Sequence, residues 1–375
     1  MSSFRKSVNI MQPTGPAAET TWNVSSGYEL RRFTTKGSAF ATSGFIESII
    51  RFSKTVSVIS FFVTLFGTPK IINLLVAKGE VVQDYHKPEK PKVPRPAGPV
   101  LLIGITVSEI VLYLLTFKIK VIAILLTAII AFIVGFTDDR KVMPGWFKPI
   151  ALIGAAIPLI VLGAHGSHLN LIFGRADIPL LYLPLIIIII PIAGNTINSI
   201  DVLNGVASGF VMITMIPLLV SISIFGNSEV LFASLPLLFA TIAFYKYHKF
   251  PSRIFPGDSG TLLMGGMYGA IAVAGNSEVI GAIALLPAVM NSFLFLSSVK
   301  KIVEHRQVKS RPTILKDDFK LVASKEKKAP TTLVRLILAD GPLSEKEIGY
   351  QIFKLAAFTS FLAFISIIIQ YHFLS

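Results

Sequence analysis

Three short motifs place carboxylates and amides at the ends of apolar runs. The most informative is Gly194 to Gly209, GNTINSIDVLNGVASG, which follows the apolar run LPLIIIIIPIA. Asn195, Asn198 and Asp201 recur every third residue, so a helix continuing from the apolar run would place them loosely on one face. Amide and carboxylate oxygens are the hard ligands that a magnesium-type cation prefers. We therefore hypothesise a cation site here, although a helix end capped by Asn and Asp would use the same residue types.

Two other motifs also place carboxylates next to an apolar run. Asp138 and Asp139 directly follow IIAFIVGFT, and two adjacent carboxylates at hydrocarbon depth repel each other and call for a cation or basic partners. Asp258 lies in FPGDSG, where the flanking glycines would let the backbone approach a phosphate or a metal closely. Each motif alone could simply face water at a helix end. Three such junctions on one side of a membrane would be hard to explain as caps, so the order of the membrane spans matters.

The composition indicates a membrane protein. Of the 375 residues, 53% are hydrophobic and 15% are charged, and the mean hydropathy is +0.69. Apolar runs of about 20 residues, enough to cross a hydrocarbon layer, recur almost end to end. We predict an all-α polytopic protein with about ten transmembrane helices in one domain, 45–375. Residues 1–44 are Ser, Thr, Gly and Pro-rich, which indicates a disordered tail or a mis-assigned start. The chain has no cysteine, which excludes disulfides and thiolate metal sites.

Charge separates the two sides of this bundle. The expected spans are 45–77, 100–117, 121–136, 150–163, 179–193, 206–225, 230–245, 262–274, 279–299 and 352–373. If they alternate, the loops after spans one, three, five, seven and nine share one side, which carries most of the basic residues, including the loop 300–349. By the positive-inside rule this side is cytoplasmic and both termini are outside. All three carboxylate motifs lie on it, and the formal charge of +14 fits membrane orientation and anionic ligands better than nucleic acid.

Basic residues on the same side could hold phosphate groups. Lys148, His305 and Arg306 are the candidates, because an arginine fork grips phosphate at two points and a lysine acts as a point charge. The segment EHRQVKSRPT could instead be a solvated loop or touch lipid headgroups.

These motifs together resemble a known family. The set GFTDDR with Lys148 ten residues after Asp138, NTINSIDVLNGVASG, FPGDSGTLLMGG and EHR is similar to the polyprenyl-phosphate N-acetylhexosamine-1-phosphate transferases, over nearly the whole chain from about residue 60. The resemblance implies a ten-helix bundle with its active site at the cytoplasmic face. It also implies transfer of a sugar 1-phosphate from a UDP-sugar to polyprenyl phosphate, with Mg²⁺ or Mn²⁺, and release of UMP.

The resemblance assigns roles by position. Asp138 and Asp139 match the paired aspartates needed for catalysis, as base or organiser, and Asn198 and Asp258 match the expected metal ligands. The residues expected to bind substrates are Asp84, Lys87, Lys148, Asn195, Asn204, His305 and Arg306. The Asn204-Gly205 turn would lie near the nucleoside, and Asp84 with Lys87 matches the first cytoplasmic loop. The implied partners are a UDP-N-acetylhexosamine, polyprenyl or dolichyl phosphate and the lipid bilayer; no nucleic acid is expected, and a homodimer is left open.

Departures from the bacterial pattern narrow the expectation. Val202 replaces the glycine usually found beside Asp201, and the histidine run of bacterial members is absent from the last cytoplasmic loop. His305-Arg306 and the basic Arg311-Pro312-Thr313 resemble the eukaryotic and archaeal type, which favours N-acetylglucosamine as the sugar and dolichyl phosphate as the acceptor. The membrane would be the plasma membrane, or the endoplasmic reticulum in a eukaryote. The alternative is a bacterial-type undecaprenyl acceptor, for cell-envelope polysaccharide or peptidoglycan precursors.

A direct displacement fits these substrates. A phosphate monoester has a second pKa of about 6, so much of the acceptor is already deprotonated at neutral pH and needs no strong base. We hypothesise that the lipid phosphate attacks the β-phosphorus directly, with Asp138 or Asp139 orienting it. The rival classes are an ion-coupled transporter, since intramembrane carboxylates also mark transport pathways, and a lipid-binding scaffold without catalysis. Transport predicts acids near the middle of spans, whereas these lie at span ends.

Overall fold

Apolar helices make up most of the computed structural model, which describes residues 56–87, 89–301, 308 and 310–374. All of these belong to one unit; a second unit, 1–51, lies outside the described residues, as do the predicted phosphate-binding residues His305 and Arg306. Seven described helices are long and apolar enough to cross a membrane: Val56–Ala77, α2 (Gly98–Thr116), α3 (Ile119–Arg140), α6 (Pro179–Ile200), α7 (Val206–Phe225), α8 (Ser228–His248) and α13 (Glu345–Leu374). Helices α10 (Glu278–Ala284) and α11 (Leu286–Val299), bent by 69° at their junction, make an eighth if they are one span.

The predicted all-α membrane class is confirmed, and besides the bent ninth span (α10 and α11), two of the ten expected spans differ from simple membrane helices. The fourth is a series of short pieces, α4 (Phe147–Ala151), η1 (Gly154–Ala156) and α5 (Ile157–Val161), with a proline in the first turn of α5. The eighth is α9 (Gly257–Ala274), whose residues are all buried. Because other helices surround α9, it can carry glycines and polar residues that a lipid-facing helix would avoid.

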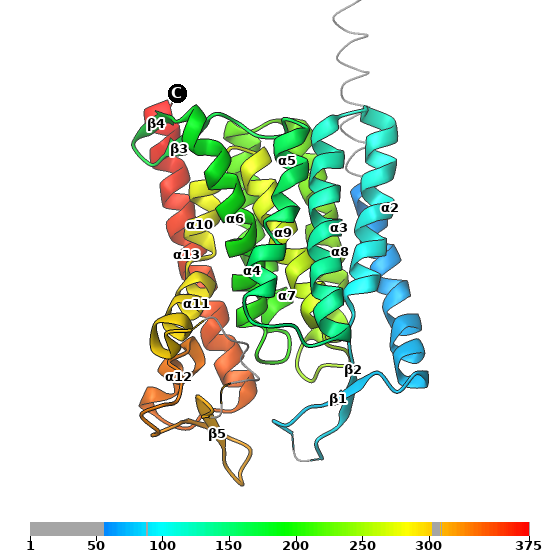
Figure 1. Ribbon diagram of the computed structural model, residues 1–375, viewed down its shortest axis with the longest axis vertical. Helices are drawn as coiled ribbons and strands as arrows, with labels where there is room; N and C mark the ends of the chain where they lie inside the picture. The colour runs from blue at the N-terminus through cyan, green and yellow to red at the C-terminus, as the bar shows by residue number, and fades with distance from the viewer. Residues whose placement is uncertain (1–55, 88, 302–307, 309, 375) are drawn as a thin grey trace, which may run out of the picture. The chain divides into compact units, whose positions relative to one another are not determined.

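Helix α9 packs mainly against α3 and α6, and it lies between them in Figure 1. Small residues let the backbones approach closely. A Cβ on Gly135 of α3 would lie 2.3 Å from the carbonyl oxygen of Asp258, and a Cβ on Gly265 of α9 would lie 2.4 Å from that of Ala193 in α6. This packing fixes the start of α9 against the end of α3, which brings two of the carboxylate motifs together.

The described residues form three antiparallel hairpins outside the helices: β1 (Val81–Gln83) with β2 (Lys92–Pro94), β3 (His168–Leu171) with β4 (Gly174–Asp177), and β5 (Thr313–Leu315) with β6 (Leu321–Ala323). The short helices α12 (Leu333–Ile337) and η3 (Leu338–Asp340) follow β6. In Figure 1 the β1–β2 hairpin and β5 lie at one end of the bundle and β3–β4 at the other. Backbone hydrogen bonds tie the first loop to the start of α9: Phe255 N–H donates to Pro94 O (3.0 Å) and Gly98 N–H to Pro256 O (3.1 Å).

Candidate active site

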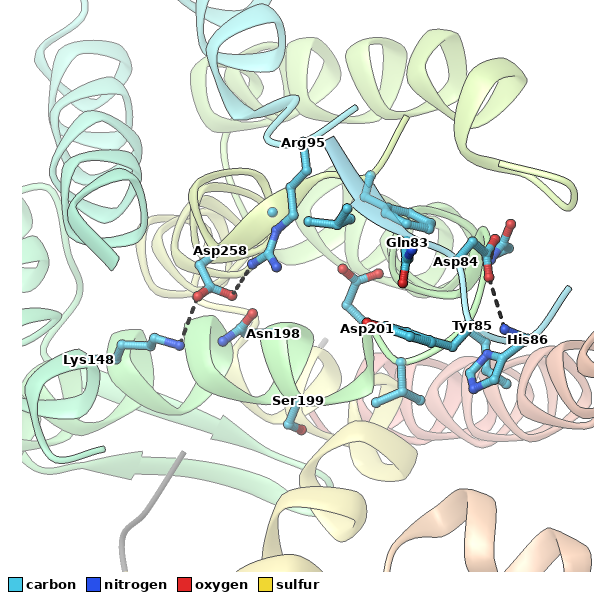
Figure 2. A pocket seen from close by; sticks show the side chains of 16 residues that line it. Gln83, Asp84, Tyr85, His86, Arg95, Lys148, Asn198, Ser199, Asp201 and Asp258 are labelled. Carbon is cyan, nitrogen blue, oxygen red and sulfur yellow. Dashed lines mark hydrogen bonds and ion pairs between the residues drawn. The ribbon is translucent and has the colours of Figure 1, made fainter. Parts of the chain in front are cut away.

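A cavity of about 390 Å³ opens at the β1–β2 end of the bundle. Four segments that are distant in the sequence line it: the first loop, helix α4, the end of α6 with the turn that follows, and the start of α9 (Figure 2). The lining residues with polar or charged side chains are Gln83, Asp84, Tyr85, His86, Arg95, Lys148, Asn198, Ser199, Asp201, Asn204 and Asp258. Segments that are far apart in the sequence therefore meet at one cavity. The predicted contribution of His305 and Arg306 lies outside the described residues.

Asp258 lies between two cations. Lys148 Nζ is 3.0 Å from Asp258 Oδ2, and Arg95 Nη2 is 3.4 Å from Asp258 Oδ1 (Figure 2). Burial of Arg95 opposes its charge, but the nearby carboxylates outweigh that cost and raise the pKa of the guanidinium above its ordinary value. Two cations therefore lie at the cavity wall, but Asp138, Asp139 and Asp258 offset their charge, so the wall suits a polyanionic ligand that arrives with a divalent cation.

Asp139 acts as an acceptor for the start of α9. Its Oδ1 accepts the backbone N–H of Asp258 at 2.9 Å and its Oδ2 accepts that of Ser259 at 2.8 Å, while Arg95 Nη2 donates to Oδ1 at 3.1 Å. Gly257, at φ +71°, leaves room for this contact, because a Cβ there would lie 2.8 Å from Asp139 Oδ2. The carboxylate therefore satisfies two amides that the helix itself leaves unpaired.

Asp138 faces a different neighbour. Its side chain is fully buried, its Oδ2 lies 3.1 Å from Lys148 Nζ, and its Oδ1 accepts the backbone N–H of Met143 at 2.9 Å. Neither Asp138 nor Asp139 lines the cavity. The pair predicted as catalytic thus lies behind the cavity wall, where Asp138 holds the lysine that reaches into it.

Oxygen ligands suited to a divalent cation meet on the same wall. Thr261 Oγ1 donates to Asn198 Oδ1 at 2.8 Å and lies 3.3 Å from the carbonyl oxygen of Asp258, so the two predicted metal ligands are neighbours, well within a Debye length. Burial raises the pKa of Asp201 to about 7; Arg95 opposes this rise, and Asp258 with its neighbouring carboxylates adds to it. The Asn198 amide oxygen and the Asp258 carboxylate oxygens are of the kind that bind Mg²⁺ or Mn²⁺. A cation beside them would also favour the charged form of the Asp201 carboxyl group.

The turn after α6 supports the far side of the cavity. Gly205 has φ +79°, which confirms the predicted Asn204-Gly205 turn and explains the glycine. The Asn204 side chain is fully paired: Oδ1 accepts Lys87 Nζ (2.6 Å) and Ser252 N–H (2.6 Å), and Nδ2 donates to Asp84 Oδ2 (3.1 Å) and Glu345 Oε1 (2.6 Å). Lys87 also forms an ion pair with Asp84. This network joins the first loop, the turn and the start of α13.

The three motifs lie inside a segment with known relatives. The sequence profile described as glycosyl transferase family 4 matches residues 121–276, which contain all three motifs. Over this segment, which is less than half of the 375 residues, the chain is similar to glycosyl transferase family 4.

Proteins similar to this chain occur in archaea and bacteria. One from Saccharolobus solfataricus, assigned as a UDP-N-acetylglucosamine–dolichyl-phosphate N-acetylglucosaminephosphotransferase, is 26% identical over 77% of this chain and 89% of its own. One from Bacillus subtilis, assigned as an undecaprenyl-phosphate N-acetylglucosaminyl 1-phosphate transferase, is 27% identical over 56% of this chain and 59% of its own. A phospho-N-acetylmuramoyl-pentapeptide-transferase from Caldicellulosiruptor bescii is 29% identical over 65% and 83%.

The cavity contains some of the predicted site residues and not others. Asp84, Lys148, Asn198, Asn204 and Asp258 line the cavity, and Lys87 contacts two of them. Asn195 does not line it, because its Nδ2 turns back along α6 to donate to the carbonyl of Pro191 at 2.8 Å.

Several contributors were not predicted: Arg95, Thr261 and Glu345, which contact predicted residues, and Gln83, Tyr85, His86 and Ser199, which line the cavity. Arg95 lies in the first loop, which was already assigned to the site through Asp84 and Lys87. Its position in the sequence could therefore have identified it as a site residue. The sequence around Glu345 did not indicate a site, because an acidic residue at the start of an apolar run is usual for a helix N-terminus.

The capping role of Asp139 predicts a loss of stability when this residue is replaced. Asp139→Ala should lower the free energy of unfolding by about 3 to 5 kcal/mol, because two amides of α9 and the buried guanidinium of Arg95 lose their acceptor. Thermal unfolding in a fixed detergent would measure it. The matched control is Asn227→Ala, which removes an ordinary cap from α8 (Val230 N–H to Asn227 Oδ1, 3.0 Å) and should cost about 1 kcal/mol. Equal losses in the two variants would contradict the special role of Asp139.

Proposed function

We propose that the protein transfers N-acetylglucosamine 1-phosphate from UDP-N-acetylglucosamine to a dolichyl-type polyprenyl phosphate, with release of UMP. The observation that carries the proposal is the wall of the cavity, where Lys148 and Arg95 flank Asp258 beside Asn198. Both substrates are polyanions, and such a wall can neutralise them together. The relative that this chain matches over 89% of its length is assigned this activity, which supports the same choice of donor and acceptor.

The cationic side chains would position the two reacting phosphates. Lys148 and Arg95 are each held by carboxylates from behind, so both can present N–H groups to a diphosphate without losing their anchors Asp138 and Asp139. Mg²⁺ or Mn²⁺ held by Asn198 and Asp258 would supply further neutralisation of the diphosphate charge. Asp139 would organise the start of α9, and Asp138 would orient Lys148.

The transfer itself needs little acid–base help from the protein. An oxygen of the acceptor phosphate attacks the β-phosphorus of the donor and forms a new P–O bond, while the P–O bond to UMP breaks and UMP leaves with the bridging oxygen. Since the acceptor phosphate has a second pKa of about 6, much of it is ionised at neutral pH. Positioning and charge neutralisation are then the main contributions of the site.

The membrane supplies the acceptor, and charge sets the orientation. Basic residues gather in the first loop and in the segment 300–349, so by the positive-inside rule the cavity faces the cytoplasm. A soluble nucleotide sugar would then enter from the cytoplasm, while the lipid phosphate would reach the same cavity from the bilayer.

Release of UMP tests the proposal directly. Purified protein with Mg²⁺, UDP-N-acetylglucosamine and a short dolichyl phosphate should release UMP and form a lipid diphosphate sugar. EDTA should stop the reaction, and added Mg²⁺ or Mn²⁺ should restore it. Undecaprenyl phosphate can be tested as the acceptor, and UDP-N-acetylmuramoyl-pentapeptide as the donor. A faster reaction with either one would identify a bacterial-type enzyme. Failure to release UMP from any UDP-sugar would exclude the transferase and leave transport or lipid binding.

A further inference from the structure

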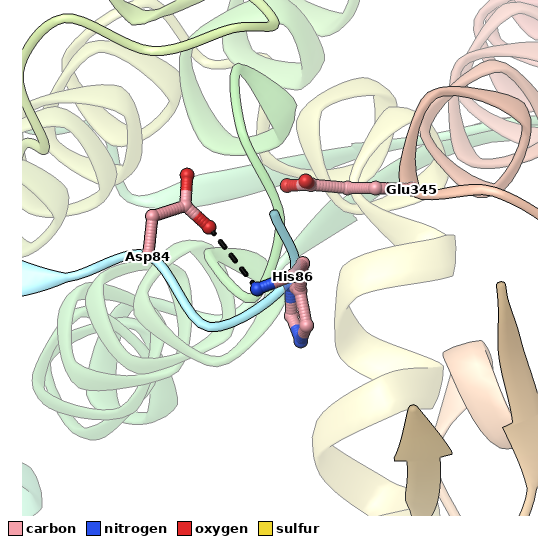
Figure 3. A group of neighbouring side chains, drawn as sticks. All are labelled: Asp84, His86 and Glu345. Carbon is pink, nitrogen blue, oxygen red and sulfur yellow. Dashed lines mark hydrogen bonds between the residues drawn. The ribbon is translucent and has the colours of Figure 1, made fainter. Parts of the chain in front are cut away.

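A second group of possible metal ligands lies apart from Asp258. Asp84, His86 and Glu345 each offer one ligand atom, and these atoms lie within 4.8 Å of one another. Figure 3 shows Glu345 reaching from α13 toward Asp84 and His86 in the first loop. Asp84 is 4% exposed and Glu345 is 5% exposed. In Figure 2 Asp84 and His86 lie on the opposite side of the cavity from Lys148 and Asp258.

One oxygen in this group lacks a partner. Glu345 Oε1 accepts both the backbone N–H of Asn204 (2.7 Å) and its Nδ2 (2.6 Å), whereas the buried Oε2 has no hydrogen-bond partner in the described part of the chain. Asp84 is similarly one-sided: Oδ2 contacts Lys87 and Asn204, and Oδ1 has a long contact of 3.4 Å with the backbone N–H of His86. A buried carboxylate oxygen without a donor is costly unless a ligand satisfies it.

The charges around these oxygens do not balance. Among the residues that the structure describes, the carboxylates of Asp84 and Glu345 face one contacting cation, Lys87, which lies on Asp84 Oδ2. Asn204 contributes only neutral donors, and all of them go to the other oxygen of each carboxylate. A net negative charge therefore remains on this pair of carboxylates, within 4.8 Å of a ring nitrogen of His86.

We propose that Asp84, His86 and Glu345 bind a second divalent cation, distinct from the one assigned to Asn198 and Asp258. Two carboxylate oxygens and one imidazole nitrogen suit Mn²⁺ or Zn²⁺ better than Mg²⁺, which favours oxygen ligands alone. The cation links the first loop to α13, segments joined otherwise through Asn204 and Lys87. Its binding stabilises the folded protein and does not depend on the transfer reaction.

Metal binding without substrates tests this site. Free Mn²⁺ can be titrated by electron paramagnetic resonance into purified metal-free protein, alongside thermal unfolding with and without Mn²⁺. Wild-type protein should bind two Mn²⁺ ions, and Asp258→Asn should keep the second site together with the Mn²⁺-dependent rise in unfolding temperature. Glu345→Gln should lose both the second site and most of that rise, while its remaining carbonyl oxygen can still accept from Asn204.

Two further variants separate the site from the fold. His86→Ala, at a partly exposed position in the loop, should weaken the second site without disturbing the Asn204 contacts. Glu326→Gln, at an exposed position beyond β6, is the matched control and should bind Mn²⁺ as the wild type does. If Glu345→Gln and His86→Ala give the wild-type isotherm, the second site does not exist. Because UMP release is not measured, that result would leave the proposed transferase activity untouched.

Discussion

An Asp258→Asn variant should release UMP about a thousandfold more slowly than the wild-type protein, or not detectably. Asp258 is the carboxylate that Lys148 and Arg95 both contact, and it lies beside Asn198 on the cavity wall. The substitution keeps the shape of the side chain but removes the charge that would hold a divalent cation and counterbalance the two basic groups. UMP release under saturating substrates and Mg²⁺ would measure the change.

The control for Asp258→Asn is Asp177→Asn. Asp177 is an exposed carboxylate of β4 that pairs with Arg175 at 3.1 Å, at the opposite end of the bundle, so its loss should leave the rate unchanged. Unfolding temperatures of both variants would show that Asp258→Asn remains folded. A folded Asp258→Asn protein that retains more than about a tenth of the wild-type rate would contradict the assignment.

Replacing Lys148 by Met should remove both activity and stability. Lys148 is 4% exposed, and its ammonium group lies 3.1 Å from Asp138 Oδ2 and 3.0 Å from Asp258 Oδ2. Without it two buried carboxylates face each other across the gap, and breaking a buried ion pair in this way typically costs about 3 to 5 kcal/mol. The rate should fall about a hundredfold or more, because the donor diphosphate loses a cation that is fixed in place. Thermal unfolding and UMP release, measured on the same sample, separate the two effects.

Two other substitutions make this prediction specific. Lys118→Met changes an exposed lysine that lies 4.0 Å from Glu229, and it should alter neither property. Lys148→Arg keeps the positive charge but replaces a compact ammonium with a planar fork that does not fit between the two carboxylates, so it should recover stability more than rate. A Lys148→Met protein as stable as the wild type would mean that Asp138 and Asp258 do not depend on the lysine.

The helices, and the gathering of the carboxylate motifs at one end of the bundle, could be predicted from the sequence. Lipid offers no hydrogen bonds to a backbone, so an apolar run of sufficient length must form a helix whatever surrounds it. The expected segments are accordingly helical where the structure describes them. The Asn204-Gly205 turn was also local, because a glycine after asparagine readily takes positive φ.

The tertiary structure decided which side chains share the site. Successive residues of a helix point in directions about 100° apart, so Asp138 turns to Lys148 while its neighbour Asp139 turns to the start of α9. No pattern in the sequence distinguishes these two directions, because they depend on which helices lie beside α3. The contact between Glu345 and Asn204 joins residues 141 positions apart. Only packing of the whole bundle brings such distant groups together, and local propensity holds no information about it.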